Sequence, residues 1–479
     1  MRFFFQIKCK FKSYLLSNSN KYVGFFVILP KPFLMRIALF FLLFFLGQYT
    51  NRAQEGFQFL GNQTQVEIPF QLINNLIFVP ITVNGIELNF LLDTGVEETL
   101  LFSLDDKKEL NLYNVDKIQL RGLGSNESIE GLKSSNNYMF VRGLVSSKQN
   151  FYIILDQNFN LSSHIGIPVN GIIGTQFFKN NLVEIDYIRK KIKVSKPNAK
   201  YQKELDKKFV KIPISIEKAK PYFNVQLKMQ DTYIQSKMLI DIGNSDAIWV
   251  FQNYTEGINV PKKNFDDFLG KGFSGDIEGK RAKISELKMA DFKFTTPIVA
   301  FPDSSSLKHV KMVDNRVGSI GAEIFRRFKV VFDYERGTIY LKKNGNFKSH
   351  FKYNKSGIEI EQNGLKWVED YIKLENNLLT SSSFGKQESD KVTVRNEYKY
   401  KFELKPNYII ANIRKKSAAE KCGLKVGDEL VSISGVPVFK YTLQKINNLF
   451  MVEEDKNITI VVLRDNNKLK FTFKLESEL

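Results

Sequence analysis

The feature that most constrains the fold is an internal repeat in which two Asp-x-Gly motifs share the same downstream landmarks. Asp93–Gly95 and Asp241–Gly243 each follow an apolar run and precede another. Gly171–Gly174 begins 78 residues after Asp93, and Gly318–Gly321 begins 77 residues after Asp241. Because landmarks of the same type recur at nearly the same spacing, the two halves are predicted to have the same fold.

The residues around the first motif predict a strand that ends at a carboxylate. Phe90–Leu92 is an apolar run typical of a buried strand, and Gly95 indicates a sharp turn. Apolar residues behind the Asp93 carboxyl allow its surroundings to set its pKa. One such motif is a weak signal, since an ordinary turn after a strand has the same pattern. Short strands separated by turn signals such as Asn84-Gly85 predict that both halves are mainly β.

Composition excludes several classes of function. The chain of 479 residues has a net charge of +19, and residues 1–53 contain eight Lys or Arg and no Asp or Glu, so the remainder carries +11. No dense basic cluster is interleaved with aromatic residues, which indicates a soluble surface and no nucleic-acid partner. Two cysteines cannot form a disulfide framework, and the three histidines lack metal-ligand spacing. The expectation is therefore no cofactor and no metal.

The N-terminal segment predicts export. Met35-Arg36 precedes the ten-residue apolar run Ile37–Leu46, and polar residues then lead to Ala53. This pattern is typical of a signal peptide, with Met35 as the true start and residues 1–53 as the leader. The protein is expected in the periplasm or outside the cell. The alternative is an uncleaved leader, which would be the only membrane attachment.

A third unit follows the repeat. Lys415–Gly435 predicts a short helix, a glycine-ended turn and a strand. Tyr441–Phe450 has the pattern of an amphipathic helix, and Ile458–Leu475 that of a closing hairpin. A polar insertion near 376–396 is expected to be a loop. The predicted domains after the leader are 54–200, 201–347 and 348–479.

These residues carry a resemblance to known families. Over residues 66–343 the two lobes resemble aspartic peptidases of the pepsin and retroviral-protease kind, in which each lobe supplies one Asp-Thr/Ser-Gly and a later hydrophobic-hydrophobic-Gly element. Residues 351–475 resemble a bacterial PDZ domain, most specifically at Gly423–Asp428. The whole chain is similar to exported, PDZ-tailed peptidases of Bacteroidetes-type bacteria. The resemblance implies two tandem acid-protease-like β-barrel lobes followed by an α+β PDZ domain.

The resemblance implies that Asp93 and Asp241 form a catalytic pair that shares one proton. The residues expected to support the pair are those that follow each aspartate: Thr94, Gly95, Ile242 and Gly243. In the family, hydroxyls from both lobes brace the pair, and Ile242 has none. We therefore expect a looser pair, with pKa values above those of pepsin and activity near neutral pH.

Two further elements are expected from the resemblance. A flap that covers the active site is assigned to Gly122, Leu123 and Gly124, with 270–275 at the matching place in the second lobe. In the PDZ unit, the backbone N–H groups of three residues are expected to bind the carboxylate of a peptide C-terminus. These residues are Ser356, Gly357 and Ile358.

The sequence thus predicts an exported, monomeric aspartic endopeptidase that acts on polypeptide and binds a peptide at its PDZ domain. Two alternatives remain at this point. In the first, the lobe with Ile242 has decayed and the protein is a weak or inactive peptide-binding pseudo-peptidase. In the second, only Asp93 is catalytic, through pairing with its copy in a homodimer.

Overall fold

The computed structural model describes most of the chain after the predicted leader. The described residues are 56–102, 109–120, 128–155, 160–252, 257–272, 275–308, 310, 312–373, 398–452 and 455–479. The predicted leader 1–53, its start at Met35 and the polar insertion near 376–396 lie outside the described residues. In the part that is described, no helix is both long and apolar enough to cross a membrane. The domain boundaries given above stay predictions.

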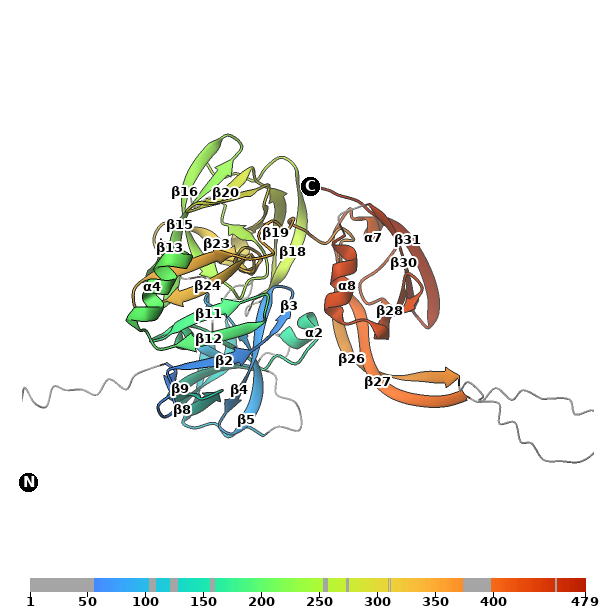
Figure 1. Ribbon diagram of the computed structural model, residues 1–479. Helices are drawn as coiled ribbons and strands as arrows, with labels where there is room; N and C mark the ends of the chain where they lie inside the picture. Colours follow the sequence, from blue (N-terminus) through green and yellow to red (C-terminus); the bar gives the residue numbers. More distant parts are fainter. Residues whose placement is uncertain are drawn as a thin grey trace, which may run out of the picture. The chain divides into compact units, whose positions relative to one another are not determined.

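The first lobe is a nine-stranded sheet in the order β1-β9-β6-β10-β5-β4-β8-β7, with β3 paired to β4 (Figure 1). The strands are β1 Gln58–Phe59, β3 Gln71–Ile73, β4 Leu76–Val83, β5 Ile86–Leu92, β6 Thr99–Leu101, β7 Val115–Leu120, β8 Ile129–Val141, β9 Leu144–Ile154 and β10 Gly171–Ile173. Two short helices, α2 (Leu161–Ile165) and α3 (Thr175–Phe178), flank β10. Asn84 and Gly85 both have positive φ, as the Asn-Gly hairpin signal requires.

The second lobe repeats this plan in a ten-stranded sheet of order β18-β19-β22-β17-β23-β16-β15-β20-β21, with β14 paired to β15. The strands are β14 Ser215–Glu217, β15 Lys220–Met229, β16 Thr232–Asp241, β17 Ile248–Val250, β18 Asn264–Gly272, β19 Gly275–Lys283, β20 Glu286–Met289, β21 Phe292–Thr295, β22 Ile298–Pro302 and β23 Arg316–Gly321. The helices are α5 (Ser304–Leu307) and α6 (Ala322–Phe325).

A six-stranded sheet of order β13-β25-β24-β11-β12-β2 joins the two lobes. Its strands are β2 Gln65–Pro69, β11 Leu182–Asp186, β12 Lys191–Ser195, β13 Val210–Pro213, β24 Phe328–Asp333 and β25 Thr338–Lys343. The equivalent strands β11 and β24 pair antiparallel at its centre, with Val183 opposite Phe332 and Ile185 opposite Val330. The lobes are therefore fixed to each other by backbone hydrogen bonds as well as by packing.

A helix connects the two lobes. The polar, lysine-rich segment Ala199–Lys208 forms helix α4. The Asn198 side chain accepts a hydrogen bond from the Tyr201 N–H and so caps the helix. Leu205 is fully buried in a small cluster with Leu182 and other residues of the joining sheet. Tyr201 packs against the same cluster, so Leu205 and Tyr201 together dock a helix whose other residues are mostly polar.

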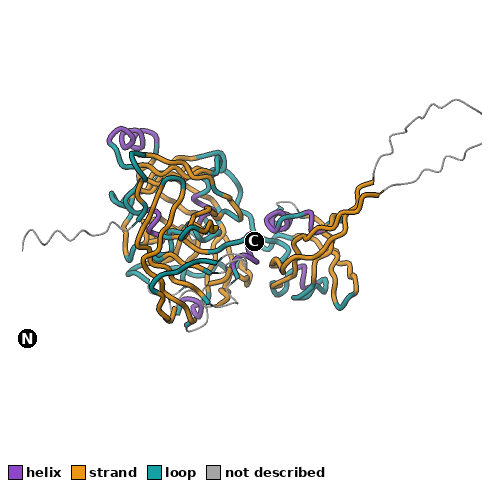
Figure 2. Tube along the Cα trace, turned by 90° about the horizontal axis from the view of Figure 1, so that it is seen from below, coloured by secondary structure: helices purple, strands orange, loops and turns teal. Residues whose placement is uncertain are grey.

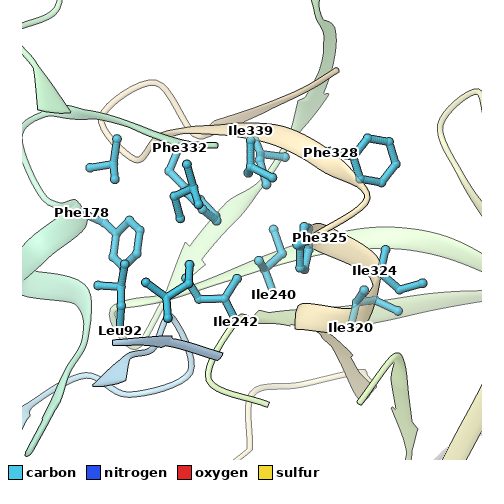
Figure 3. Packing of buried hydrophobic residues seen from close by; sticks show 14 of the residues in the cluster. Leu92, Phe178, Ile240, Ile242, Ile320, Ile324, Phe325, Phe328, Phe332 and Ile339 are labelled. Carbon is cyan, nitrogen blue, oxygen red and sulfur yellow. The ribbon is translucent and has the colours of Figure 1, made fainter. Parts of the chain in front are cut away.

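One hydrophobic core runs through both lobes. Figure 3 shows its centre, where Leu92 and Phe178 of the first lobe lie with Ile240 and Ile242 of the second, below Phe332. All five side chains are fully buried. Burial of this kind contributes about 1.5–3 kcal/mol per large apolar side chain, so separating the lobes would expose a large part of the core.

The third unit has its own sheet, in the order β26-β27-β28-β30-β31 with β29 on β28, and its own core. The strands are β26 Ile358–Lys373, β27 Tyr398–Ile413, β28 Glu429–Ile433, β29 Val436–Pro437, β30 Lys456–Arg464 and β31 Asn467–Leu475. The helices are α7 (Ala418–Lys421), α8 (Leu443–Phe450) and the 3-10 helix Val438–Lys440. Figure 2 shows that strands dominate the described chain. The mainly β prediction is confirmed.

Candidate active site

The two aspartates stand at equivalent strand ends. Strand β5 ends at Leu92, one residue before Asp93, and β16 ends at Asp241. In each lobe the strand of the later glycine element lies parallel to the strand that carries the aspartate, β10 beside β5 and β23 beside β16. The Asp93 N–H donates to Ile173 O at 2.9 Å. The repeated glycine elements therefore hold, by strand pairing, the backbone of the two strand ends that carry the carboxyl groups.

The structure brings Asp93 and Asp241 together, with a hydrogen bond between their side chains. The Gly95 N–H donates to Asp93 Oδ1 at 2.6 Å. A Cβ on Gly243 would lie 2.1 Å from Asp93 Cγ, and one on Gly95 would lie 3.0 Å from Asp241 Oδ1. Only glycine lets the backbone approach the opposite carboxyl this closely. Both predicted glycines thus contact the pair.

The electrostatics of the pair favour one shared proton. Burial, together with the charge of Asp241, raises the pKa of Asp93 to about 8. Burial also raises the pKa of Asp241, although Arg316, the hydrogen bond from Asp93 and the charge of Lys220 oppose the rise. The hydrogen bond raises the pKa of Asp93 and lowers that of Asp241. Both pKa values are raised, so the two carboxyls hold one proton between them.

Thr94 braces the pair from one side only. Its Oγ1 donates to Ile240 O at 2.6 Å and accepts the Ile242 N–H at 3.1 Å, and all three groups are buried. Ile242 stands at the equivalent place in the second lobe, but its side chain packs in the shared core (Figure 3). It has no hydroxyl that could make the equivalent hydrogen bonds to the first lobe. The brace is made by one hydroxyl.

Two hairpin tips cross between the lobes near the pair, and sequence reasoning missed both. Asn75 Nδ2, between β3 and β4, donates to Ser245 O and to Glu323 Oε2, each at 2.9 Å. In the opposite direction, Thr175 Oγ1 of the first lobe donates to Ala219 O, between β14 and β15. These two hairpins occupy equivalent places in the repeat, and that equivalence was the sequence signal that could have identified their contacts.

The predicted flap residues Gly122, Leu123 and Gly124 lie outside the described residues. The strands on either side form an antiparallel hairpin in which Leu120 of β7 pairs with Ile129 of β8. In the second lobe β18 and β19 form the equivalent hairpin. A role of either hairpin as a flap stays a prediction.

The predicted peptide-binding segment of the third unit leads into β26, an edge strand of its sheet that begins at Ile358. Its backbone donors are already engaged. The N–H groups of Ser356 and Gly357 donate to Asn354 Oδ1 at 3.0 and 3.3 Å, and the Ile358 N–H donates to Ser356 Oγ at 3.0 Å. A peptide carboxylate would have to compete with these bonds, and its binding here stays a prediction. The described residues include no group of three or more His, Cys, Asp or Glu that could hold a metal.

Comparison with known proteins agrees with this geometry. Residues 79–177 match the family model for aspartyl protease, and residues 409–464 match that for the PDZ domain. The chain contains an aspartyl protease domain and a PDZ domain. The first match includes Asp93 but not Asp241, so the second carboxyl is found through the repeat and the fold. No curated protein matches the chain.

One similar solved structure is the aspartic proteinase from Irpex lacteus. It has 12% sequence identity and a TM-score of 0.40, and the match covers 60% of this chain and 99% of that chain.

Proposed function

We propose that this protein is an exported aspartic endopeptidase that hydrolyses peptide bonds with a water activated between Asp93 and Asp241, and that its PDZ domain binds polypeptide. The observation that supports the proposal most directly is the pair itself. Two buried carboxyls from equivalent strands of one chain lie in hydrogen-bond contact, and one of them has a strongly raised pKa.

The chemistry assigns a different role to each carboxyl. The ionised carboxyl of the pair takes a proton from the attacking water. The protonated carboxyl donates a hydrogen bond to the scissile carbonyl oxygen, where negative charge develops. The proton taken from the water then passes to the leaving amine, so that the pair again holds one proton. Aspartic proteases share one proton between two carboxyls in the same way.

The predicted leader supports a location in the periplasm or outside the cell. The edge strand β26 and helix α8 are the kind of elements between which an extended peptide adds as a strand. A single chain supplies both carboxyls, which supports a monomer as the active species.

Cleavage of a denatured protein tests the proposal. We expect the wild type to cleave it, and both Asp93→Asn and Asp241→Asn to lose cleavage by at least about a thousandfold, because each variant lacks one of the two carboxyl roles. Asp231→Asn, an exposed aspartate in a turn of the second lobe, is the matched control and should cleave normally.

Other outcomes identify the alternatives. If wild type and Asp93→Asn bind peptide equally and neither cleaves, the protein is a peptide-binding pseudo-peptidase, as the missing hydroxyl at Ile242 suggests. If Asp241→Asn keeps activity and the active species elutes as a dimer, the catalytic pair is Asp93 with its own copy in the partner chain.

A further inference from the structure

The two lobes present chemically different side chains at equivalent positions beside the catalytic pair. In the first lobe Phe78 lies opposite Leu91, two residues before Asp93. In the second lobe Tyr222 lies opposite Leu239, two residues before Asp241. The residue two places before Phe78 is Leu76, and the residue two places before Tyr222 is Lys220. Lys220 therefore occupies the position of Leu76.

A second pair of positions shows the same difference. The Phe102 N–H donates to Asn170 O in the first lobe, and the Phe251 N–H donates to Val317 O in the second. The residue before Asn170 is Val169, and the residue before Val317 is Arg316. Arg316 therefore occupies the position of Val169.

The two sets of residues lie in unlike surroundings. Leu76 and Val169 are buried in an apolar cluster that also contains Ile129 of the β7–β8 hairpin. The corresponding cluster in the second lobe is small, consisting of Tyr222, Leu239 and Val313. Lys220 and Arg316 take the places that apolar side chains fill in the first lobe.

Within the described part of the chain, neither cation forms an ion pair. Among the described residues, Lys220 Nζ has no hydrogen-bond or ion-pair partner. Arg316 Nε donates to Gly318 O at 3.1 Å, and its guanidinium lies 5.0 Å from the centre of the Phe251 ring, but it forms no ion pair within the described chain. Partly buried cations without partners are uncommon, because desolvation is unfavourable unless a charge is paired.

The catalytic pair does not neutralise the two cations. Lys220 lies close enough to lower the pKa of both Asp93 and Asp241 against the effect of burial, and Arg316 acts in the same way on Asp241. A pair that shares one proton carries one negative charge, so two cations leave an excess of one positive charge. Glu97 also acts on Lys220, but it is exposed and forms no ion pair with it.

We propose that Lys220 and Arg316 determine specificity by binding an acidic side chain of the substrate next to the scissile bond. This inference rests on the proposed peptidase function and names its substrate class. A carboxylate placed between Lys220 Nζ and the Arg316 guanidinium supplies the missing charge and receives charge-assisted hydrogen bonds. The preferred substrate therefore has an acidic residue next to the cleaved bond.

The test uses the full chain and quenched fluorescent peptides in matched pairs that differ only by Glu or Gln, with the variable residue moved through three places on each side of the scissile bond. We expect Glu to raise kcat/KM by about tenfold or more at one place on one side only, because hydrogen bonds to charged groups are the strong ones. The preference should shrink as salt is added.

Variants assign the preference to the two cations. Lys220→Leu and Arg316→Val install the first-lobe residues and should reduce the Glu preference to about twofold or less, while cleavage of the Gln peptides continues. Lys220→Arg should keep the preference. Lys288→Leu, at an exposed lysine of the same lobe, should leave both rates unchanged. Thermal melting of each variant confirms that it is folded.

The outcomes separate this inference from the proposed function. Equal cleavage of Glu and Gln peptides by the wild type leaves the peptidase proposal standing and overturns the inference. A changed pH profile in Lys220→Leu with an unchanged Glu preference also overturns it, since the cations would then act only on the catalytic pair. If no peptide is cleaved, the peptidase proposal fails. The inference about Lys220 and Arg316 is then decided by calorimetry of the Glu and Gln peptides with Asp93→Asn. It requires the Glu peptide to bind more tightly than the Gln peptide.

Discussion

Replacing Thr94 with valine removes the one hydroxyl that braces the catalytic pair while almost preserving side-chain volume. The hydroxyl makes two buried hydrogen bonds to the other lobe, at 2.6 Å to Ile240 O and at 3.1 Å from the Ile242 N–H. Both backbone groups would lose this partner. An unsatisfied buried polar group destabilises by about 1–3 kcal/mol, so we expect the free energy of unfolding to fall by about 2–6 kcal/mol.

Thr99→Val is a matched control in the same lobe. Thr99 is also buried, but its Oγ1 has no hydrogen-bond partner in the described structure. Removing an unpartnered hydroxyl should leave the free energy of unfolding unchanged or raise it, because burial of a polar group without a hydrogen bond is unfavourable. The two variants thus differ in their hydrogen bonds and hardly in their volume or burial.

Thermal melting by scanning calorimetry measures the difference. With about 2–4 °C of melting temperature per kcal/mol for units of this size, Thr94→Val should melt about 5–20 °C below Thr99→Val. Its kcat/KM should also fall by more than tenfold, because small displacements of catalytic groups strongly reduce rate. Melting temperatures for the two variants within about 1 °C of each other would refute the idea that Thr94 braces the lobes.

Two other predictions follow from the same site. The pKa of Asp93 is raised to about 8 from its ordinary value of 3.8. We therefore expect kcat/KM to fall as pH rises through about 8, because the shared proton is then lost. The free energy of unfolding should also fall as pH rises from about 4 to about 8, because over this range the folded state holds a proton that the unfolded state has released. A pH–rate profile that peaks below about pH 4 would contradict this. Gly243→Ala should abolish cleavage, because its Cβ would lie 2.1 Å from Asp93 Cγ. Gly345→Ala is the control and should leave the cleavage rate unchanged, because no atom lies within 4 Å of its Cβ. Equal cleavage rates for the two variants would show that the close approach of Gly243 is unimportant.

The strands of the repeat were predictable because their signals are local. An apolar run that ends in Asp-x-Gly forms a strand and a turn in both lobes, and the Asn-Gly pair forms a hairpin with positive φ. Helix α4 was missed because its residues are mostly polar, although Asn198 at its start is a good N-cap residue. Its docking depends on the burial of Leu205 by strands that are distant in sequence.

The sequence by itself determined which residues form the candidate site, because the duplicated spacing identifies Asp93, Asp241 and their glycines without coordinates. Only the tertiary structure decided how the two halves meet. The contact between the carboxyls, the one-sided brace from Thr94 and the place of Lys220 beside the pair all depend on the register of strands in different lobes. Register is set by the packing of a shared core and a shared sheet, so local sequence does not encode these contacts.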